Sequence, residues 1–302
     1  MAVSKVQVTL NGTTYTLAFN AGTGKYEGQL TAPGKSSYSL SGKYYPVTVK
    51  ATDSAGNSTT VGVSDAALGA SLQLKVRETV KPVIAITAPT ESQKLTNNKP
   101  TVSWTVTDDD SGVNAATIGI TIDSGSKITG GITKTAVTGG YQCSYAISTA
   151  LADGSHTIKI DGSDNDGNAA TQRTVNFVVD TVPPVLSVTS PANNLITNQT
   201  AVTVAGNTND ATSSPVALTV KLNSETAQSV TVGSSGAFSK ALTLAAGENT
   251  ITIVARDGAG KTSTITRKVT LDTSAPVIGA VTLSPNPVST GEVLTISVTV
   301  TD

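Results

Sequence analysis

Apolar and polar residues alternate along most of the 302-residue chain, in short runs that turn residues separate. A period of two places successive side chains on opposite faces of a half-buried β-strand. The last ten residues, Val-Leu-Thr-Ile-Ser-Val-Thr-Val-Thr-Asp (293–302), show this pattern clearly. No convincing helical period is found, so the pattern predicts an all-β protein built of short strands.

A longer period lies over the strand pattern, as in tandem-repeat proteins. A strand that opens on proline or next to it occurs three times, at residues 81–89, 183–191 and 275–285. A strand that ends in Asp and a glycine-containing turn also occurs three times, at residues 47–57, 158–168 and 251–261. In such turns Asp accepts hydrogen bonds from backbone N–H groups and Gly takes a positive φ. We expect this capping role for Asp53, Asp164 and Asp257.

These repeats resemble the bacterial immunoglobulin-like domains of surface adhesins and phage tail proteins. The resemblance rests on two Asp-Thr-x-x-Pro linkers, residues 180–184 and 272–276, and on the strand and turn of residues 247–260. It implies tandem immunoglobulin-like β-sandwiches, a fold that serves as spacer, binder or stalk. The Cys…Trp…Cys pattern of antibody domains is absent. Cys143, the only cysteine, and Trp104 are predicted to fill the core of one sandwich.

The repeats divide the chain into two complete domains and two fragments. Residues 80–180 and 181–271 each approach the ~100 residues of such a sandwich. Residues 1–79 hold later strands without the opening proline strand, whereas residues 272–302 hold only opening strands of a further domain. The fragments therefore look like two parts of one split domain.

We expect the final strands of one chain to complete the first domain of the next chain, head to tail, by strand addition. Unpaired strand edges are adhesive, and the stiff linkers of the middle domains disfavour closure within one chain. Such a contact forms a ring or a filament. The alternatives are another virion protein as the partner, or no partner. The strand residues expected to take part are Leu294, Ile296, Val298, Val300, Val6 and Val8.

Residues for catalysis are scarce. His156, the only histidine, is expected to be a solvent-facing strand residue, and no Gly-x-Ser-x-Gly elbow accompanies it. One His and one Cys cannot build a zinc site. Residues 22–25, Gly-Thr-Gly-Lys, lack the first glycine and the helix of a phosphate loop, so they are predicted to form a hairpin turn. The sequence predicts no enzyme and no required cofactor.

Calcium is the one metal that the sequence leaves open. Calcium takes six to eight oxygen ligands, and two loops place several side-chain oxygens close together, on Asp164, Asp166, Asn168, Asp108 and Asp110. No Glu follows at EF-hand spacing, and the loops at Asp53 and Asp257 carry one carboxylate each. Turn capping is therefore the main interpretation, and calcium binding is the alternative.

Surface recognition is predicted only weakly. Aromatic residues are 4% of the chain, and their one cluster lies in residues 1–79. Tyr38, Tyr44 and Tyr45, in or beside the loop of residues 32–43, are the candidates for contact with a glycan or protein of a bacterial surface, with core packing as the alternative.

Charge and targeting signals narrow the function. The net charge is −1, with charged residues at 14%, so no nucleic-acid surface is predicted. No run approaches the ~20 apolar residues of a membrane span. The first residues enter a strand pattern without a secretory signal. We therefore expect a structural protein of a phage virion, in the tail or an appendage, with a bacterial cell-surface adhesin stalk as the alternative and a carbohydrate-binding module as a third class.

Overall fold

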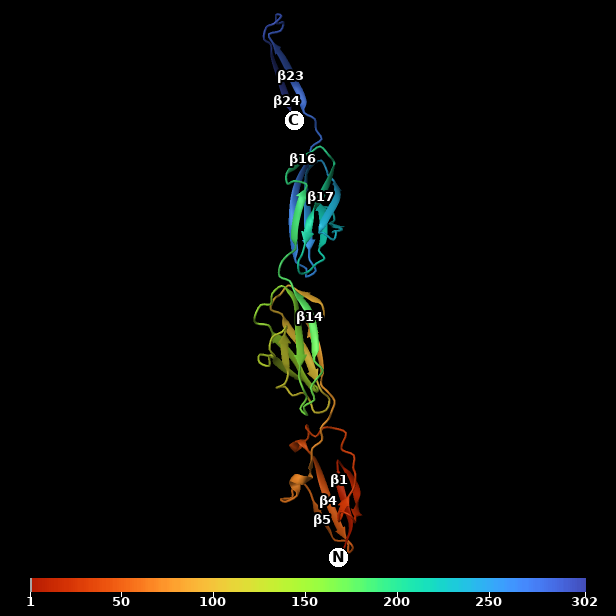
Figure 1. The fold of residues 1–302 in the computed structure, drawn as a ribbon. Helices are drawn as coiled ribbons and strands as arrows, with labels where there is room; N and C mark the ends of the chain where they lie inside the picture. The colour runs from red at the N-terminus through yellow and green to blue at the C-terminus, as the bar shows by residue number, and fades with distance from the viewer. Residues whose placement is uncertain (1) are drawn as a thin grey trace. The chain divides into compact units, whose positions relative to one another are not determined.

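The computed structural model describes residues 2–302, in which β-strands dominate and the only helical elements are two short 3₁₀ turns, η1 (Ser41–Lys43) and η2 (Gly69–Leu72) (Figure 1). The all-β prediction is confirmed. The chain divides into two compact units, Met1–Val179 and Asp180–Asp302.

The first domain is one sheet, here called the first sheet. Its strand order is β3-β2-β1-β4-β5, with β6 paired to β4. The turn between β1 and β2 has positive φ at Asn11 (47°) and Gly12 (77°), as expected for an Asn-Gly hairpin. The strands are β1 (Val3–Leu10), β2 (Thr13–Asn20), β3 (Lys25–Glu27), β4 (Tyr45–Asp53), β5 (Ser58–Val61) and β6 (Gln73–Leu74).

The second sandwich packs sheet β7-β9-β12-β11 against sheet β10-β13-β14-β8. Its core holds Trp104, Cys143 and Phe177, all almost fully buried, which confirms the prediction for the first two. The strands are β7 (Val83–Ala88), β8 (Gln93–Leu95), β9 (Thr101–Thr107), β10 (Gly119–Ile122), β11 (Thr133–Val137), β12 (Gly140–Ala146), β13 (Gly154–Asp161) and β14 (Arg173–Val179).

The third sandwich repeats this plan, with sheet β15-β17-β20 against sheet β16-β22-β21-β18-β19. Alternation along β21 buries Ile251, Ile253 and Ala255 completely. The strands are β15 (Val185–Ser190), β16 (Leu195–Thr197), β17 (Ala201–Asn209), β18 (Ala217–Leu222), β19 (Gln228–Val230), β20 (Ala237–Thr243), β21 (Gly247–Arg256) and β22 (Thr262–Leu271).

The chain ends in an antiparallel hairpin, here called the terminal hairpin, of β23 (Val277–Ser284) and β24 (Thr295–Thr301) (Figure 1). No third strand of residues 2–302 joins it.

Two strands expected in the first domain are shorter than the alternation suggests. The sequence indicates strands at residues 26–30 and 72–76, whereas β3 ends at Glu27 and β6 holds only two residues. A strand persists only where its backbone groups find partners. The residues after Glu27 have no neighbouring strand in the described chain.

Candidate functional site

The first sheet matches one layer of a complete sandwich. Its order β2-β1-β4-β5 corresponds to β19-β18-β21-β22 in the third sandwich. Val8 pairs with Val49 as Val220 pairs with Ile253. Within residues 2–302 no second sheet packs on the first sheet. Val8 and Val49 are half-buried where Val220 and Ile253 are buried, although Val6 and Leu10 of the first sheet are buried.

The terminal hairpin matches the opening strands of the second sandwich. β24 and β9 have seven residues each, with the sequences Thr-Ile-Ser-Val-Thr-Val-Thr and Thr-Val-Ser-Trp-Thr-Val-Thr. Val277 pairs with Thr301 as Val83 pairs with Thr107. The hairpin is exposed along its whole length, so the apolar side chains that a sandwich would bury lie open.

The strand that would receive β24 is also identifiable. In the complete sandwiches, β9 pairs with β12 and β17 pairs with β20, and a glycine of positive φ, Gly139 or Gly236, precedes the receiving strand. Gly24 (φ 66°) precedes Lys25 in the same way. Residues 25–31 are therefore the counterpart of β12 and β20.

The surroundings of these three glycines differ in one respect. A Cβ at Gly139 would lie 2.8 Å from the carbonyl oxygen of Asp108, and one at Gly236 would lie 2.3 Å from that of Thr208. At Gly24 no atom lies within 4 Å of such a Cβ. The neighbouring strand that requires glycine in both sandwiches is thus missing beside Gly24.

The expected assembly residues are distributed unevenly over these surfaces. Ile296, Val298 and Val300 lie exposed in β24, and Leu294 precedes the strand. Val6 and Val8 lie in β1, both of whose edges are already paired, with β2 and β4. Val6 is already buried, so only the half-buried Val8 can meet a donated strand through its side chain, and the free backbone lies in residues 28–31.

An acidic cluster lies where the chain enters the second sandwich. One carboxylate oxygen each of Glu78, Asp108 and Asp164 lies within 4.8 Å of those of the other two. At this separation two ionised carboxylates repel each other by on the order of 3 kcal/mol at an effective dielectric constant of about 20. Burial raises the pKa of Glu78, with a further contribution from the charges of Asp108 and Asp110, while the Ser111 N–H opposes the shift. The cluster can hold a hard cation such as Ca²⁺.

Of the five residues expected at a calcium site, three lie outside the cluster and have partners elsewhere. Asp110 accepts hydrogen bonds from the N–H of Ser36 (3.0 and 3.1 Å), and Asp166 accepts one from the N–H of Glu78 (3.0 Å). Asn168 donates its side-chain amide to Asp164 Oδ2 (2.7 Å). The loops turn these side chains toward neighbouring backbone or toward Asp164, so only Asp108 and Asp164 enter the cluster.

The sequence reasoning missed Glu78. The sequence does mark this residue: each repeat has an acidic residue four positions before its opening proline. Glu78 stands before Pro82 as Asp180 and Asp272 stand before Pro184 and Pro276.

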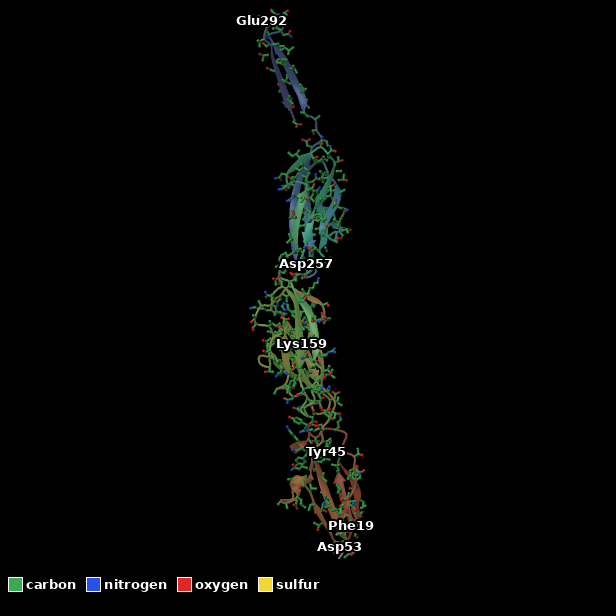
Figure 2. All side chains as sticks on the ribbon, viewed as in Figure 1. Phe19, Tyr45, Asp53, Lys159, Asp257 and Glu292 are labelled. Atoms are coloured by element: carbon green, nitrogen blue, oxygen red, sulfur yellow. The ribbon has the colours of Figure 1, made fainter. Side chains whose placement is uncertain are left out.

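The capping roles of the turn aspartates are confirmed. Asp53, Asp164 and Asp257 each accept two backbone N–H groups of their own turn at Oδ1. The hydrogen bond from the side-chain amide of Asn57, together with those from the backbone N–H groups of the turn, holds the pKa of Asp53 below its usual value. Figure 2 labels Asp53, the last residue of β4, and Asp257, which directly follows β21.

The three tyrosines expected to form a recognition surface differ in their exposure. Tyr45 is buried, and its hydroxyl donates to the carbonyl of Lys35 (3.2 Å), so a recognition role for Tyr45 is wrong. Tyr38 and Tyr44 are half-buried, and the Lys43 ammonium lies 3.8 Å from the centre of the Tyr38 ring. Tyr38 also lines an open cavity of about 220 Å³ with Lys43, Lys75, Arg77 and Asp166.

His156 does not face solvent, contrary to the sequence expectation. Its side chain is 10% exposed, and its two ring nitrogens lie 2.9 Å from Asp123 Oδ2 and 2.8 Å from the carbonyl oxygen of Ala152. Burial opposes the charged ring, but these two acceptors outweigh it and raise the pKa of His156. Residues 22–25 form the predicted turn between β2 and β3, where the Gly24 N–H donates to the carbonyl of Asn20 (2.8 Å).

Comparisons with known proteins agree with this architecture. A model of a bacterial Ig domain matches residues 82–160, and a model of glucodextranase domain B matches residues 184–273. No curated protein matches the chain.

Solved structures with similar folds include the fibronectin(III)-like modules of Clostridium thermocellum CbhA, at 14% identity over 63% of this chain and 94% of that one (TM-score 0.39). Titin domains A168–A170 match at 14% identity over 76% of this chain and 73% of that one (TM-score 0.43). Immunoglobulin domains 1–5 of Sidekick-1 match at 10% identity over 91% and 55% (TM-score 0.40).

The fold defines a protein of tandem immunoglobulin-like β-sandwiches. The family matches make these sandwiches bacterial immunoglobulin-like repeats. Within residues 2–302 no helix has the length and apolar character needed to cross a membrane.

Proposed function

We propose that the chain is a non-enzymatic structural protein that displays immunoglobulin-like domains and assembles head to tail, the terminal hairpin of one copy completing the first sheet of the next. The observation that carries the proposal is the match between the two incomplete parts. β24 has the length of β9, and it pairs with β23 from the same end as β9 pairs with β7, whereas the segment after Gly24 lacks the strand that β9 and β17 provide elsewhere.

The expected register follows from the second sandwich, whose β9 has the length of β24. In the second sandwich Val106 pairs with Tyr141, so Val300 of the donor, which occupies the position of Val106, is expected opposite Tyr26. Tyr26 and Phe19 form a tilted ring pair, centroids 5.3 Å apart, with Phe19 57% exposed. The donated β24 would add main-chain hydrogen bonds at residues 25–31, and its apolar face would cover the first sheet.

The oligomeric state of the full chain, measured by light scattering over a concentration series, tests the assembly. The full chain is expected to form dimers and larger species, and a deletion of residues 272–302 is expected to be monomeric. A peptide of residues 275–302 is expected to bind to the deletion variant with one-to-one stoichiometry. A monomeric full chain, or unchanged assembly after the deletion, contradicts the proposal.

A second variant covers the case in which the deletion leaves the first sheet unfolded. A copy of residues 272–302 fused ahead of Ala2 through a flexible linker supplies the missing strands within the same chain. We expect this fusion to be folded and monomeric. If it still assembles like the full chain, the first sheet is not the acceptor.

We place the protein in a phage virion, in the tail or an appendage, where the assembled domains would face outward and aid attachment to the bacterial surface. The resemblance of the repeats to phage tail domains supports this setting. The bacterial Ig match over residues 82–160 favours a second candidate, a stalk segment of a cell-surface adhesin. Antibodies against the second sandwich, applied to purified particles and to intact cells, distinguish the two by which surface they label.

A further inference from the structure

The third sandwich carries its own cluster of three carboxylates. One oxygen each of Asp180, Asp210 and Asp257 lies within 4.8 Å of those of the other two. Their residues are 0%, 7% and 5% exposed. Asp180 precedes β15, Asp210 follows β17, and Asp257 begins the turn between β21 and β22, so residues distant in sequence meet at one end of the sandwich.

One oxygen of each carboxylate already has partners. Asp180 Oδ1 accepts the N–H of Val182 (3.2 Å). Asp210 Oδ1 accepts those of Thr212 and Ser213 (2.8 and 2.5 Å). Asp257 Oδ1 accepts those of Ala259 and Lys261 (both 2.9 Å). These bonds fix the three side chains in place.

The second carboxylate oxygens of two of these residues have no such partners. Asp180 Oδ2 and Asp257 Oδ2 are buried and have no hydrogen-bond partner within residues 2–302. The ion pairs Lys127–Asp161, His156–Asp123 and Lys268–Glu248 do not involve this cluster. Buried charges are ordinarily paired or bound to metal, and two unpartnered buried oxygens beside a third carboxylate offer ligands for a cation.

A backbone hydrogen bond holds two of the three loops together. The Gly258 N–H donates to the carbonyl of Ser213 (2.8 Å), which ties the loop after Asp210 to the turn of Asp257. The second sandwich has the same tie, from the Asn165 N–H to the carbonyl of Gly112 (3.0 Å). The cluster is thus held by the fold itself.

We propose that Asp180, Asp210 and Asp257 bind one Ca²⁺ ion. Calcium binds carboxylate oxygens at 2.3–2.6 Å, so oxygens on opposite sides of one ion lie about 5 Å apart, which agrees with the separation in the cluster. Three carboxylates supply part of the six to eight ligands, and water completes the shell. Magnesium, with its shorter bonds and strict octahedral geometry, fits this set less well.

Calorimetric titration of the full chain with Ca²⁺, after chelator treatment, tests the site. Because Asn retains an oxygen that can accept the turn N–H groups, Asp257→Asn and Asp180→Asn each preserve the capping and remove a charge. Each variant is expected to bind one Ca²⁺ fewer than the wild-type chain, or to bind it at least tenfold more weakly. Glu225→Gln, an exposed carboxylate of the same sandwich, is the matched control and should bind like wild type.

Thermal unfolding provides a second readout that does not depend on the variants. Calcium is expected to raise the unfolding midpoint of the wild-type third sandwich, and Mg²⁺ at the same concentration to raise it less. Unchanged stoichiometry in both Asn variants, or a wild-type midpoint that Ca²⁺ does not move, overturns the proposal.

Discussion

The first sheet and the third sandwich use the same strands in the same register, yet only one of them has a closed core. Val47 and Val49 of β4 occupy the positions of Ile251 and Ile253 in β21. The valines are half-buried and the isoleucines are fully buried. The strand pattern therefore forms one layer by itself, and full burial of these positions depends on a second layer, which the proposed assembly would supply to the first sheet.

The largest effects of substitution are expected at a strand position that is buried in the second sandwich and exposed in the terminal hairpin. Trp104 in β9 and Val298 in β24 correspond, with Trp104 0% and Val298 50% exposed. Trp104→Ala is expected to destabilise the second sandwich by about 3–5 kcal/mol through the cavity it leaves. Val298→Lys should leave the unassembled chain within about 0.5 kcal/mol of wild type and abolish assembly, because the donated side chain would enter a core.

Urea unfolding gives the first quantity and light scattering the second. Trp104→Phe is the control for the cavity, because it keeps most of the ring volume and loses an indole N–H that has no partner in the described chain. If Val298→Lys assembles like wild type, the correspondence between β24 and β9 does not extend to assembly.

The sequence predicted the repeated elements well because each depends on local chemistry. Alternation indicated β9 and β21, and the Asn11-Gly12 and Asp257 turns follow from their own residues. The sequence did not predict the short β3, because the length of that strand depends on a neighbour rather than on its own residues. The acidic clusters combine residues about 30 to 90 positions apart, such as Glu78 with Asp164, and only the fold brings these together.

The two acidic clusters differ in a way that sharpens the comparison. In the second sandwich the Asn168 amide occupies Asp164 Oδ2, whereas in the third Lys261 takes the place of Asn168 and Asp257 Oδ2 has no partner among residues 2–302. We therefore expect the third sandwich to bind Ca²⁺ more tightly. The corresponding positions of the split domain are Asp272, Asp302 and Asp53, so assembly would gather a third set of carboxylates from two chains.

Assembly should accordingly depend on calcium, as the next largest effect. Removing Ca²⁺ is expected to weaken head-to-tail association about tenfold, or roughly 1.4 kcal/mol, because three carboxylates would meet without a counter-charge. Asp302→Asn should reduce this dependence, and Glu292→Gln, in the loop of the terminal hairpin (Figure 2), should preserve it. Analytical ultracentrifugation in the presence of calcium and of a chelator measures the association constant. Equal association constants in both conditions would show that assembly does not depend on calcium.

The smallest effect concerns His156, which packs beside Phe177 in the second sandwich, ring centroids 5.7 Å apart. Both ring nitrogens face acceptors, the Asp123 carboxylate and the Ala152 carbonyl, and only the protonated ring can donate to both. Because the folded state raises the pKa of His156 above 6.5, the protonated ring stabilises the fold. This stabilisation is fully present below pH 6.5 and is lost as the pH rises through the folded-state pKa.

We expect wild type to lose less than about 1 kcal/mol of stability relative to His156→Gln between pH 5.5 and 8.5, because Asp123 is partly open to solvent, which screens the pair. Urea unfolding of the second sandwich at the two pH values measures the difference. Asp123→Asn keeps an oxygen for the Thr157 N–H, which donates to Asp123 Oδ1 (2.8 Å), and removes the charge, so it should reduce the pH dependence. The third sandwich, in which no histidine occurs, is the internal control. A pH dependence of equal size there would assign the effect to groups other than His156.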